Sequence, residues 1–319
     1  MRAVAVREFQ GTPASMDVPE PTAGPGELRV RLTAAGMNPF DAKIADGIFA
    51  GHRPHVFPLI LGVDGAGTVE AVGPGVDRYR PGDRLFGSFL HNPVGRGTYA
   101  EAVVVPERQA LARRPDGIDP VVAASLPTAG LTGLTALDAL AVPAGATLLI
   151  VGASGGVGSF AIPLAAARGV RPIAVGRVDA HPRLLRLGAA EAIDVAAADL
   201  LERLRAAAPG GFGGLLDLAS DKTRFAGLAA LVRPGGTAAT TTFVADAATA
   251  PPGVAVLNVD MKPTSAGLER LAAELTTGRL TPTPPRVISL DEAPAALAAL
   301  RAGRGDGKTV IRLADGRSS

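Results

Sequence analysis

Four glycines follow a short apolar stretch in LLIVGASGGVGSF, residues 148–160. Ala153, Gly155 and Gly158 fill the G-x-G-x-x-G pattern, with alanine at the first place, between a strand pattern and a helical pattern. Residues without a Cβ let backbone N–H groups approach a pyrophosphate, and the helix N-terminus adds a partial positive charge. The alternative is a glycine-rich turn without a ligand. The pattern predicts a dinucleotide-binding turn made by Ser154, Gly155, Gly156 and Val157.

The residues after the next strand indicate which dinucleotide is bound. Folds that bind NAD place an acidic residue there, about 20 residues after the glycines, to hold the ribose 2′-hydroxyl. Here the strand pattern of residues 171–175 is followed by Gly176 and Arg177. A guanidinium suits a 2′-phosphate through its charge and its bidentate geometry, so we expect NADPH as the cofactor. Asp179 leaves NADH open, and the alternative for Arg177 is a solvated loop residue.

Strand and helix patterns divide the chain into stretches of different character. The first 110 residues alternate apolar and polar positions in short runs between Gly/Pro turns, which predicts a barrel or sandwich. In the middle, strand patterns alternate with helical stretches, which predicts βαβ units and a parallel sheet. The strand patterns of this part lie at 147–151, 171–175, 214–219, 236–243 and 254–259.

Charge and composition argue against several classes of protein. The 32 Lys+Arg and 30 Asp+Glu residues give a net charge of +2 without a basic cluster, so we expect no nucleic-acid partner. The chain has no cysteine, which excludes disulfides, thiolate metal sites and a cysteine nucleophile. The N-terminal MRAVAVREFQ has no signal-peptide pattern, and no run of about 18 apolar residues occurs. We therefore expect no membrane partner and a cytoplasmic location.

Seven segments along the chain, in this order, point to one known family. They are AAGMNPFDAKIADG, LGVDGAGTVEAVGPGVDRYRPGDRLFG, GTYAEAVVVP, LPTAGLTGLTAL, LLIVGASGGVG, LRLGAAEAIDV and GKTVIRL. Together they resemble the zinc-free quinone oxidoreductase branch of the medium-chain dehydrogenase/reductase superfamily. The resemblance implies an α/β fold with two domains: a GroES-like β-rich barrel from residues 1–122 and 263–319, which carries the catalytic and substrate residues, and a doubly wound parallel Rossmann domain, residues 123–262, which binds the dinucleotide.

The resemblance also implies roles for single residues. Asn38 matches the asparagine beside the nicotinamide ribose and the substrate, although Asn38-Pro39 is alternatively a turn. Asp41 supports Asn38 or is a surface acid. The other matches to cofactor-binding positions are Thr128, Thr132 (alternatively a helix brace), Ser220, Thr242, Phe243 and Lys308 (alternatively a surface lysine).

The same resemblance indicates where the substrate binds and whether a metal is bound. Many relatives have tyrosine where this chain has Phe49, which has no proton to give. We expect the substrate pocket at Phe49, His52 and His91. Zinc-dependent relatives have a cysteine and a histidine where Asn38 and Val63 stand, and neither is a usual zinc ligand. We therefore expect no metal.

The expected activity follows from these features. Without zinc to polarise an oxygen atom, hydride addition to an electron-poor acceptor remains feasible. We expect an NADPH-dependent reductase of quinones or α,β-unsaturated carbonyls. The alternatives are a tailoring enoyl reductase for a polyketide or thioester intermediate, and an NADPH-binding sensor with little turnover. The resemblance also implies a homodimer joined through the strand at 254–259, which is otherwise an exposed apolar edge.

Overall fold

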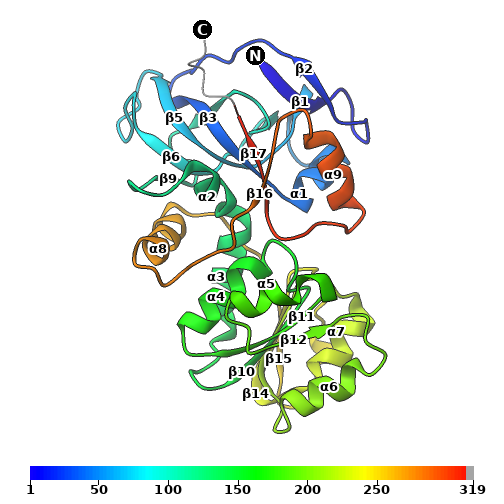
Figure 1. Ribbon diagram of the computed structural model, residues 1–319. Helices are drawn as coiled ribbons and strands as arrows, with labels where there is room; N and C mark the ends of the chain where they lie inside the picture. The colour runs from blue at the N-terminus through cyan, green and yellow to red at the C-terminus, as the bar shows by residue number, and fades with distance from the viewer. Residues whose placement is uncertain (314–319) are drawn as a thin grey trace. The chain divides into compact units, whose positions relative to one another are not determined.

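The computed structural model describes residues 1–313 of the 319-residue chain. The chain forms two compact units (Figure 1). Within the described residues, the first unit consists of residues 1–129, 263–276 and 284–313, and the second of residues 130–262 and 277–283. The α/β fold class is confirmed, because the chain contains both helices and strands and the second unit holds a parallel sheet.

The first unit is built mainly from antiparallel strands. A four-stranded sheet has the order β2-β1-β4-β7, and a seven-stranded sheet has the order β16-β17-β3-β5-β6-β9, with β8 also paired to β3. The strands are β1 (Arg2–Val6), β2 (Ala14–Asp17), β3 (Glu27–Met37), β4 (His55–Ile60), β5 (Asp64–Val72), β6 (Arg84–Ser88), β7 (Val94–Arg96), β8 (Ala102–Pro106), β9 (Leu111–Arg113), β16 (Arg286–Ile288) and β17 (Thr309–Arg312).

The alternating pattern of β3 explains its place at the centre of this unit. Leu28, Val30 and Leu32 are fully buried, and the residues between them are only partly buried. These side chains belong to a core that also includes side chains of β1, β6 and β17. The helices of the first unit are α1 (Pro39–Ala45), α2 (Pro120–Ser125), α8 (Ser265–Thr276) and α9 (Ala293–Arg301).

The second unit is a parallel sheet with the order β12-β11-β10-β13-β14-β15. All five strand patterns predicted for this part form strands: β10 (Thr147–Val151), β11 (Arg171–Gly176), β13 (Phe212–Asp217), β14 (Val232–Thr240) and β15 (Ala255–Asn258). The sixth strand is β12 (Glu191–Asp194), and α3 (Pro127–Leu140) leads into this unit. The order reverses between β10 and β13, and open α/β sheets bind ligands beyond the carboxyl ends of the strands at such a point.

Helices cover both faces of this sheet, as Figure 1 shows. Side chains of α6 (Leu200–Ala207) and α7 (Lys222–Ala229) share one apolar core with residues of β10, β11 and β13. The opposite face carries α4 (Gly158–Ala167) and α5 (His181–Arg186). Two short 3₁₀ turns, Val178–Ala180 and Ala247–Thr249, complete the second unit. Within residues 1–313, no helix has the length and apolarity that crossing a bilayer requires.

Candidate functional site

The pairing of β17 with β3 brings together two polar side chains that are 270 residues apart in the sequence. Thr309 pairs with Met37 in this antiparallel register, so Lys308 comes beside Asn38. Lys308 Nζ donates to Asn38 Oδ1 at 2.5 Å. Both residues are buried, with 5% and 4% of their surface exposed. The ammonium therefore fixes the orientation of the Asn38 amide, and Lys308 is not a surface lysine.

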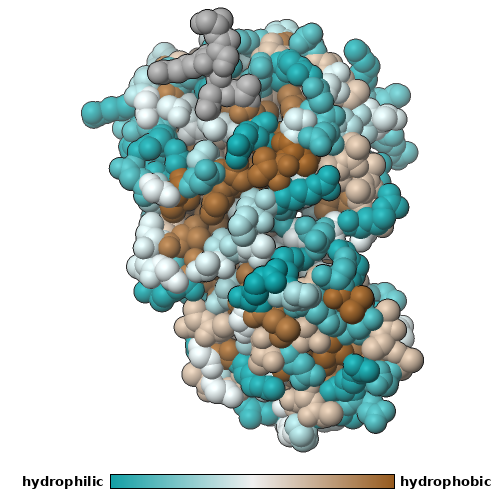
Figure 2. Space-filling view, in the orientation of Figure 1, coloured by the Kyte–Doolittle hydropathy of each residue, from teal (hydrophilic) through white to brown (hydrophobic). Residues whose placement is uncertain are grey.

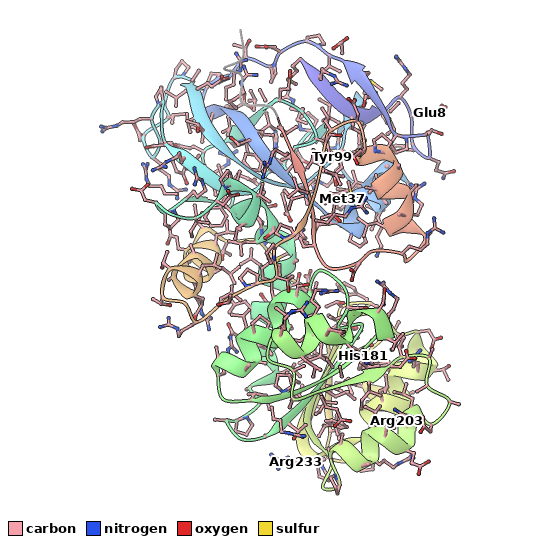
Figure 3. All side chains as sticks on the ribbon, viewed as in Figure 1. Glu8, Met37, Tyr99, His181, Arg203 and Arg233 are labelled. Atoms are coloured by element: carbon pink, nitrogen blue, oxygen red, sulfur yellow. The ribbon has the colours of Figure 1, made fainter. Side chains whose placement is uncertain are left out.

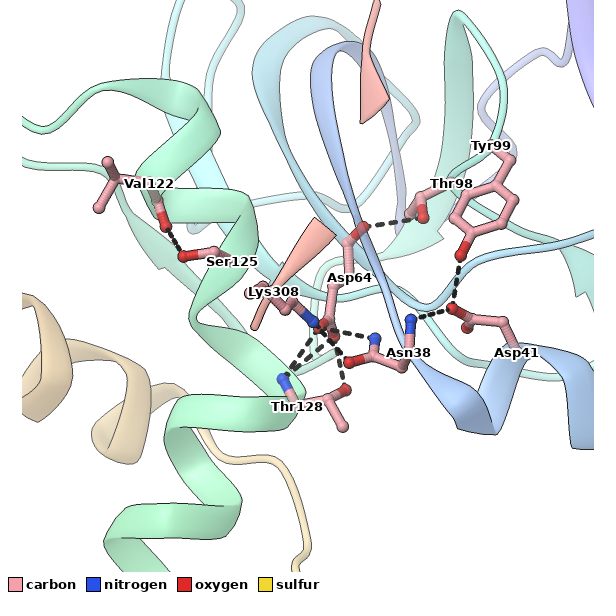
Figure 4. Close-up of polar contacts among 9 residues, drawn as sticks. All are labelled: Asn38, Asp41, Asp64, Thr98, Tyr99, Val122, Ser125, Thr128 and Lys308. Carbon is pink, nitrogen blue, oxygen red and sulfur yellow. Dashed lines mark hydrogen bonds and ion pairs between the residues drawn. The ribbon is translucent and has the colours of Figure 1, made fainter. Parts of the chain in front are cut away.

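Asp64, the first residue of β5, is at the centre of this cluster (Figure 4). Its fully buried carboxylate accepts hydrogen bonds from Asn38 Nδ2 at 2.9 Å and from Thr128 Oγ1 at 2.7 Å. The backbone N–H of Thr128 donates to the same carboxylate, and Lys308 Nζ lies 3.2 Å from Oδ2. A buried carboxylate needs such a cation and such donors, because its charge is otherwise costly.

Asp64 was missed by the sequence-based reasoning. The available signal was an acidic residue inside the apolar run LILGVDGA, residues 59–66. Charged residues are almost never fully buried unless they are paired. An acidic residue in such an apolar run therefore indicates a cationic partner elsewhere in the chain.

Asp41 acts on the backbone of Asn38 from the first turn of α1. One of its oxygens, Oδ2, accepts from the Asn38 N–H at 2.7 Å and from the Tyr99 hydroxyl at 2.6 Å. Asp41 and Tyr99 are fully buried. Figure 3 labels Tyr99 in the first unit, and Figure 4 draws its contact with Asp41. Burial raises the pKa of Asp41 to about 7, and it also raises the pKa of Tyr99. Asp41 is thus a buried group that positions Asn38, and not a surface acid.

The glycine turn lies between β10 and α4 in the second unit. A Cβ on Gly158 would lie 2.1 Å from the carbonyl oxygen of Ala153, so the start of α4 packs against the turn only with glycine there. A Cβ on Gly155 would meet nothing closer than 3.4 Å. Packing therefore does not explain the glycine at 155, whereas the close approach of a phosphate would. The turn, which also contains Ser154, Gly156 and Val157, fits a dinucleotide pyrophosphate.

A second buried carboxylate organises the carboxyl ends of β13 and β14. Asp217, the last residue of β13, accepts from Ser220 Oγ at 2.7 Å and from Thr240 Oγ1 at 3.0 Å. Thr242 Oγ1 donates to the Ser220 carbonyl at 3.0 Å. The chain then continues to Phe243, whose side chain is exposed and whose φ is 63°, an uncommon value for an aromatic residue. Two of the predicted cofactor residues, Ser220 and Thr242, are thus joined in one network.

The loop after β11 contains the predicted Arg177 directly after Gly176. Arg177 Nε lies 3.2 Å from Asp179 Oδ1, and this ion pair is partly exposed. Arg183 was not predicted; its guanidinium reaches the glycine turn, where Nη2 donates to the Ser154 carbonyl at 3.0 Å. The sequence indicated only that Arg183 lies in the helical stretch that follows Arg177.

The remaining predicted residues lie in different surroundings. Phe49 packs its ring against Phe40, with centroids 5.8 Å apart, whereas His52 is exposed. His91 is buried, its Nδ1 lies 2.8 Å from the Phe89 carbonyl oxygen, and burial lowers its pKa. Thr132 is buried in α3.

Figure 2 shows apolar side chains gathered on one face of the first unit. A hollow of about 680 Å³ is lined by residues of α2 and β16, among them Val121 and Val287. No residue that the sequence singles out as a site residue lines this hollow.

Comparisons with known proteins agree with this geometry. Residues 24–116 match the family described as alcohol dehydrogenase GroES-like domain, and residues 187–311 match the family described as zinc-binding dehydrogenase. The dehydrogenase orsE of Emericella nidulans is 33% identical over 252 residues, which are 69% of this chain and 71% of that protein. The chain belongs to the medium-chain dehydrogenase/reductase superfamily. It is therefore an oxidoreductase, and its family implies a nicotinamide cofactor.

Two further relatives of this medium-chain dehydrogenase/reductase are named for quinones. A chloroplast envelope quinone oxidoreductase homolog of Arabidopsis thaliana is 37% identical over 177 residues, and the match spans 52% of each protein. The solved quinone oxidoreductase of Coxiella burnetii superimposes with a TM-score of 0.85 at 25% identity, covering 98% of this chain and 99% of that one.

One matched family is described as zinc-binding, but the side chains at this site do not fit a zinc ion. The resemblance expects the zinc-binding cysteine and histidine of zinc-dependent relatives at the positions that Asn38 and Val63 occupy, and the Asn38 oxygen already accepts a hydrogen bond from the Lys308 ammonium. Among residues 1–313, no three His, Cys, Asp or Glu side chains are grouped so that they could hold a metal ion.

Proposed function

We propose that the protein is a zinc-independent, NADPH-dependent reductase whose acceptor is a quinone or an α,β-unsaturated carbonyl compound. The buried cluster of Asn38, Asp64 and Lys308 carries this proposal, because it orients an amide at the position where the resemblance expects the metal-binding cysteine of zinc-dependent relatives. With a quinone, the balanced reaction consumes NADPH, a proton and the quinone, and it yields NADP⁺ and the hydroquinone.

The cofactor end of the proposed reaction is assigned to the second unit. Bound NADPH would supply the hydride. The turn at Ser154, Gly155, Gly156 and Val157 would hold its pyrophosphate with backbone N–H groups. Thr132, Ser220, Thr242 and Phe243 of this unit are proposed to line the rest of the dinucleotide path, and Thr128 of the first unit is proposed to bind the same cofactor.

The choice of NADPH rests on the charges that follow β11. Arg177, His181, Arg183 and Arg186 lie within ten residues, and Asp179 is the acidic residue among them. This excess of basic groups suits a 2′-phosphate, which carries more negative charge than a ribose hydroxyl. The pairing of Arg177 with Asp179 reduces the excess without cancelling it.

The acceptor end is assigned to Asn38 and its neighbours. The Asn38 amide has two N–H donors, and Asp64 accepts one of them. We assign the other to the acceptor oxygen, where negative charge develops as the hydride arrives. An oriented donor in a buried site stabilises such charge with little reorganisation.

The proposal is tested by following NADPH oxidation with 1,4-naphthoquinone, a small enone and a crotonyl thioester, each repeated with NADH. We expect turnover of the quinone or the enone, faster with NADPH. Turnover of the thioester alone would instead favour the enoyl reductase. Binding of NADPH without turnover of any acceptor would favour the sensor. The cytoplasmic location also remains a proposal.

A further inference from the structure

Arg53 is an arginine that its surroundings hold in place without neutralising it. It lies in the loop between α1 and β4 of the first unit. Its Nε donates to Asn92 Oδ1 at 2.7 Å, and its guanidinium carbon lies 4.8 Å from the centroid of the Phe49 ring. Stacking and one hydrogen bond thus fix the plane of the guanidinium.

Within residues 1–313, the charge of this guanidinium has no acidic partner. In the described part of the chain, Arg53 forms no ion pair with a carboxylate, and its Nη1 and Nη2 atoms make no hydrogen bond. Burial lowers its pKa, and no acidic neighbour counteracts this. Other arginines in the same unit differ, since Arg29, Arg31 and Arg84 each contact a carboxylate.

The surroundings of Arg53 are aromatic and connect to Asn38. Phe49 packs edge-on against Phe40, which belongs to the first turn of α1, the helix that Asn38 caps. On the other side, Asn92 directly follows His91, and the charge of Arg53 contributes to the lowered pKa of His91. The start of α1 and the segments at 49–53 and 91–92 are therefore neighbours within one unit.

We infer that Arg53 is an anion-binding subsite for the acceptor, so that the protein reduces conjugated carbonyl compounds that carry a carboxylate, sulfonate or phosphate group. The two Nη atoms form the end of the guanidinium fork and can bind two oxygens of such a group. The Phe49 and Phe40 rings offer apolar surface to the flat part of the same molecule. This inference rests on the proposed function for its reaction, but not for its binding step.

The test compares a charged and an uncharged acceptor of the same ring size. The KM and kcat for 1,4-naphthoquinone-2-sulfonate and for 1,4-naphthoquinone are measured with NADPH for the wild type, Arg53→Gln and Arg53→Lys. We expect Arg53→Gln to raise the KM for the sulfonate by about tenfold or more, with the KM for the neutral quinone nearly unchanged. Arg53→Lys keeps the charge but loses the forked guanidinium. Its KM for the sulfonate should therefore lie between those of the wild type and Arg53→Gln.

Arg78→Gln is the matched control, because Arg78 also stacks on an aromatic ring, that of Tyr79 at 5.3 Å. It should change neither KM. An equal change for both quinones in Arg53→Gln, or no change for either, would overturn the inference.

A binding experiment keeps the subsite separate from the proposed reaction. The affinity of naphthalene-2-sulfonate for each protein is measured by calorimetry without any turnover, with 2-naphthol as the uncharged reference. Selective loss of sulfonate binding in Arg53→Gln would support the subsite even if no quinone were reduced. Unchanged sulfonate binding in that variant would refute it, whatever the activity.

Discussion

Lys308 Nζ lies 2.5 Å from Asn38 Oδ1 and 3.2 Å from Asp64 Oδ2, inside the first unit. One ammonium thus compensates a buried carboxylate and orients the neighbouring amide. The stability of the first unit and the orientation of the Asn38 amide are therefore coupled, because removing one of these groups leaves another buried group without its partner.

Replacing Lys308 tests this coupling. Lys308→Met leaves the Asp64 charge without its cation, so we expect a loss of about 3–5 kcal/mol in the free energy of unfolding, measured with urea. The double variant Asp64→Asn/Lys308→Met should recover part of this loss, because it removes both charges. Lys43→Met, at an exposed lysine of α1, is the control and should change stability by less than about 0.5 kcal/mol. Equal stability of Lys308→Met and Lys43→Met would contradict the role of the ion pair.

Asp41 should make the stability depend on pH. Its pKa is about 7 in the folded protein and about 3.9 in an unfolded chain. The folded state therefore binds the proton more tightly, and the free energy of unfolding falls as pH rises from about 4 to about 7. We expect this contribution to be on the order of a few kcal/mol.

Unfolding by urea at a series of pH values checks this prediction. Asp41→Asn, which has no charge to acquire, should show a weaker decline over this range than the wild type. Asp77→Asn, at an exposed position, should behave like the wild type. Parallel curves for Asp41→Asn and the wild type would show that Asp41 does not titrate in this range.

The two glycines of the turn should respond differently to the same substitution. A Cβ at 158 would overlap the Ala153 carbonyl, so Gly158→Ala should lower the unfolding free energy by about 1–3 kcal/mol. Gly155→Ala should leave stability nearly unchanged but weaken NADPH binding by about tenfold or more. Thermal unfolding and fluorescence titration with NADPH measure the two effects. Unweakened NADPH binding to Gly155→Ala would argue against a phosphate at this turn.

Cofactor choice should depend on the pair that follows β11. Arg177→Ala should raise the Kd for NADPH by about 10- to 100-fold, the value of a charged hydrogen bond, and leave NADH binding little changed. Asp179→Asn should favour NADPH further, because it releases Arg177 from its carboxylate. Arg233→Ala, at the amino end of β14, is the control. A similar loss for both cofactors in Arg177→Ala would indicate a general structural effect.

The edge of the parallel sheet should join two copies of the chain. β15 is the last strand in the order and pairs only with β14 in the described chain. Unpaired edges favour association, so we expect a dimer of about twice 32.1 kDa in sedimentation equilibrium. Leu257→Lys, on this strand but outside the apolar core, should shift the protein toward monomer. A wild type that sediments only as monomer would refute this assembly.

The elements of the second unit were largely predictable from the sequence. The apolar strand at 147–151, the glycines after it and the helix that follows are local patterns with local causes. Tertiary packing did not need to be known to place Gly155 in the turn after a buried strand and Gly158 at the start of the helix that follows.

The polar cluster of the first unit was predictable only in part. Asn38 was found through its motif, but its contacts with Asp64 and Lys308 depend on strand register across most of the chain. No local pattern encodes such a register. Arg53 was missed for a related reason, since only the structure of residues 1–313 shows that this loop arginine contacts none of their carboxylates.

The position of β17 beside β3 has a consequence for synthesis. A ribosome adds about 5–20 residues per second, and Asn38 leaves it well before Lys308 is made. Until then the buried Asp64 has no cation, and the amide of Asn38 is not held. A nascent chain that has not yet reached Lys308 therefore lacks the cation of this buried cluster, and the Asn38 amide can take up its fixed orientation only after β17 has been made.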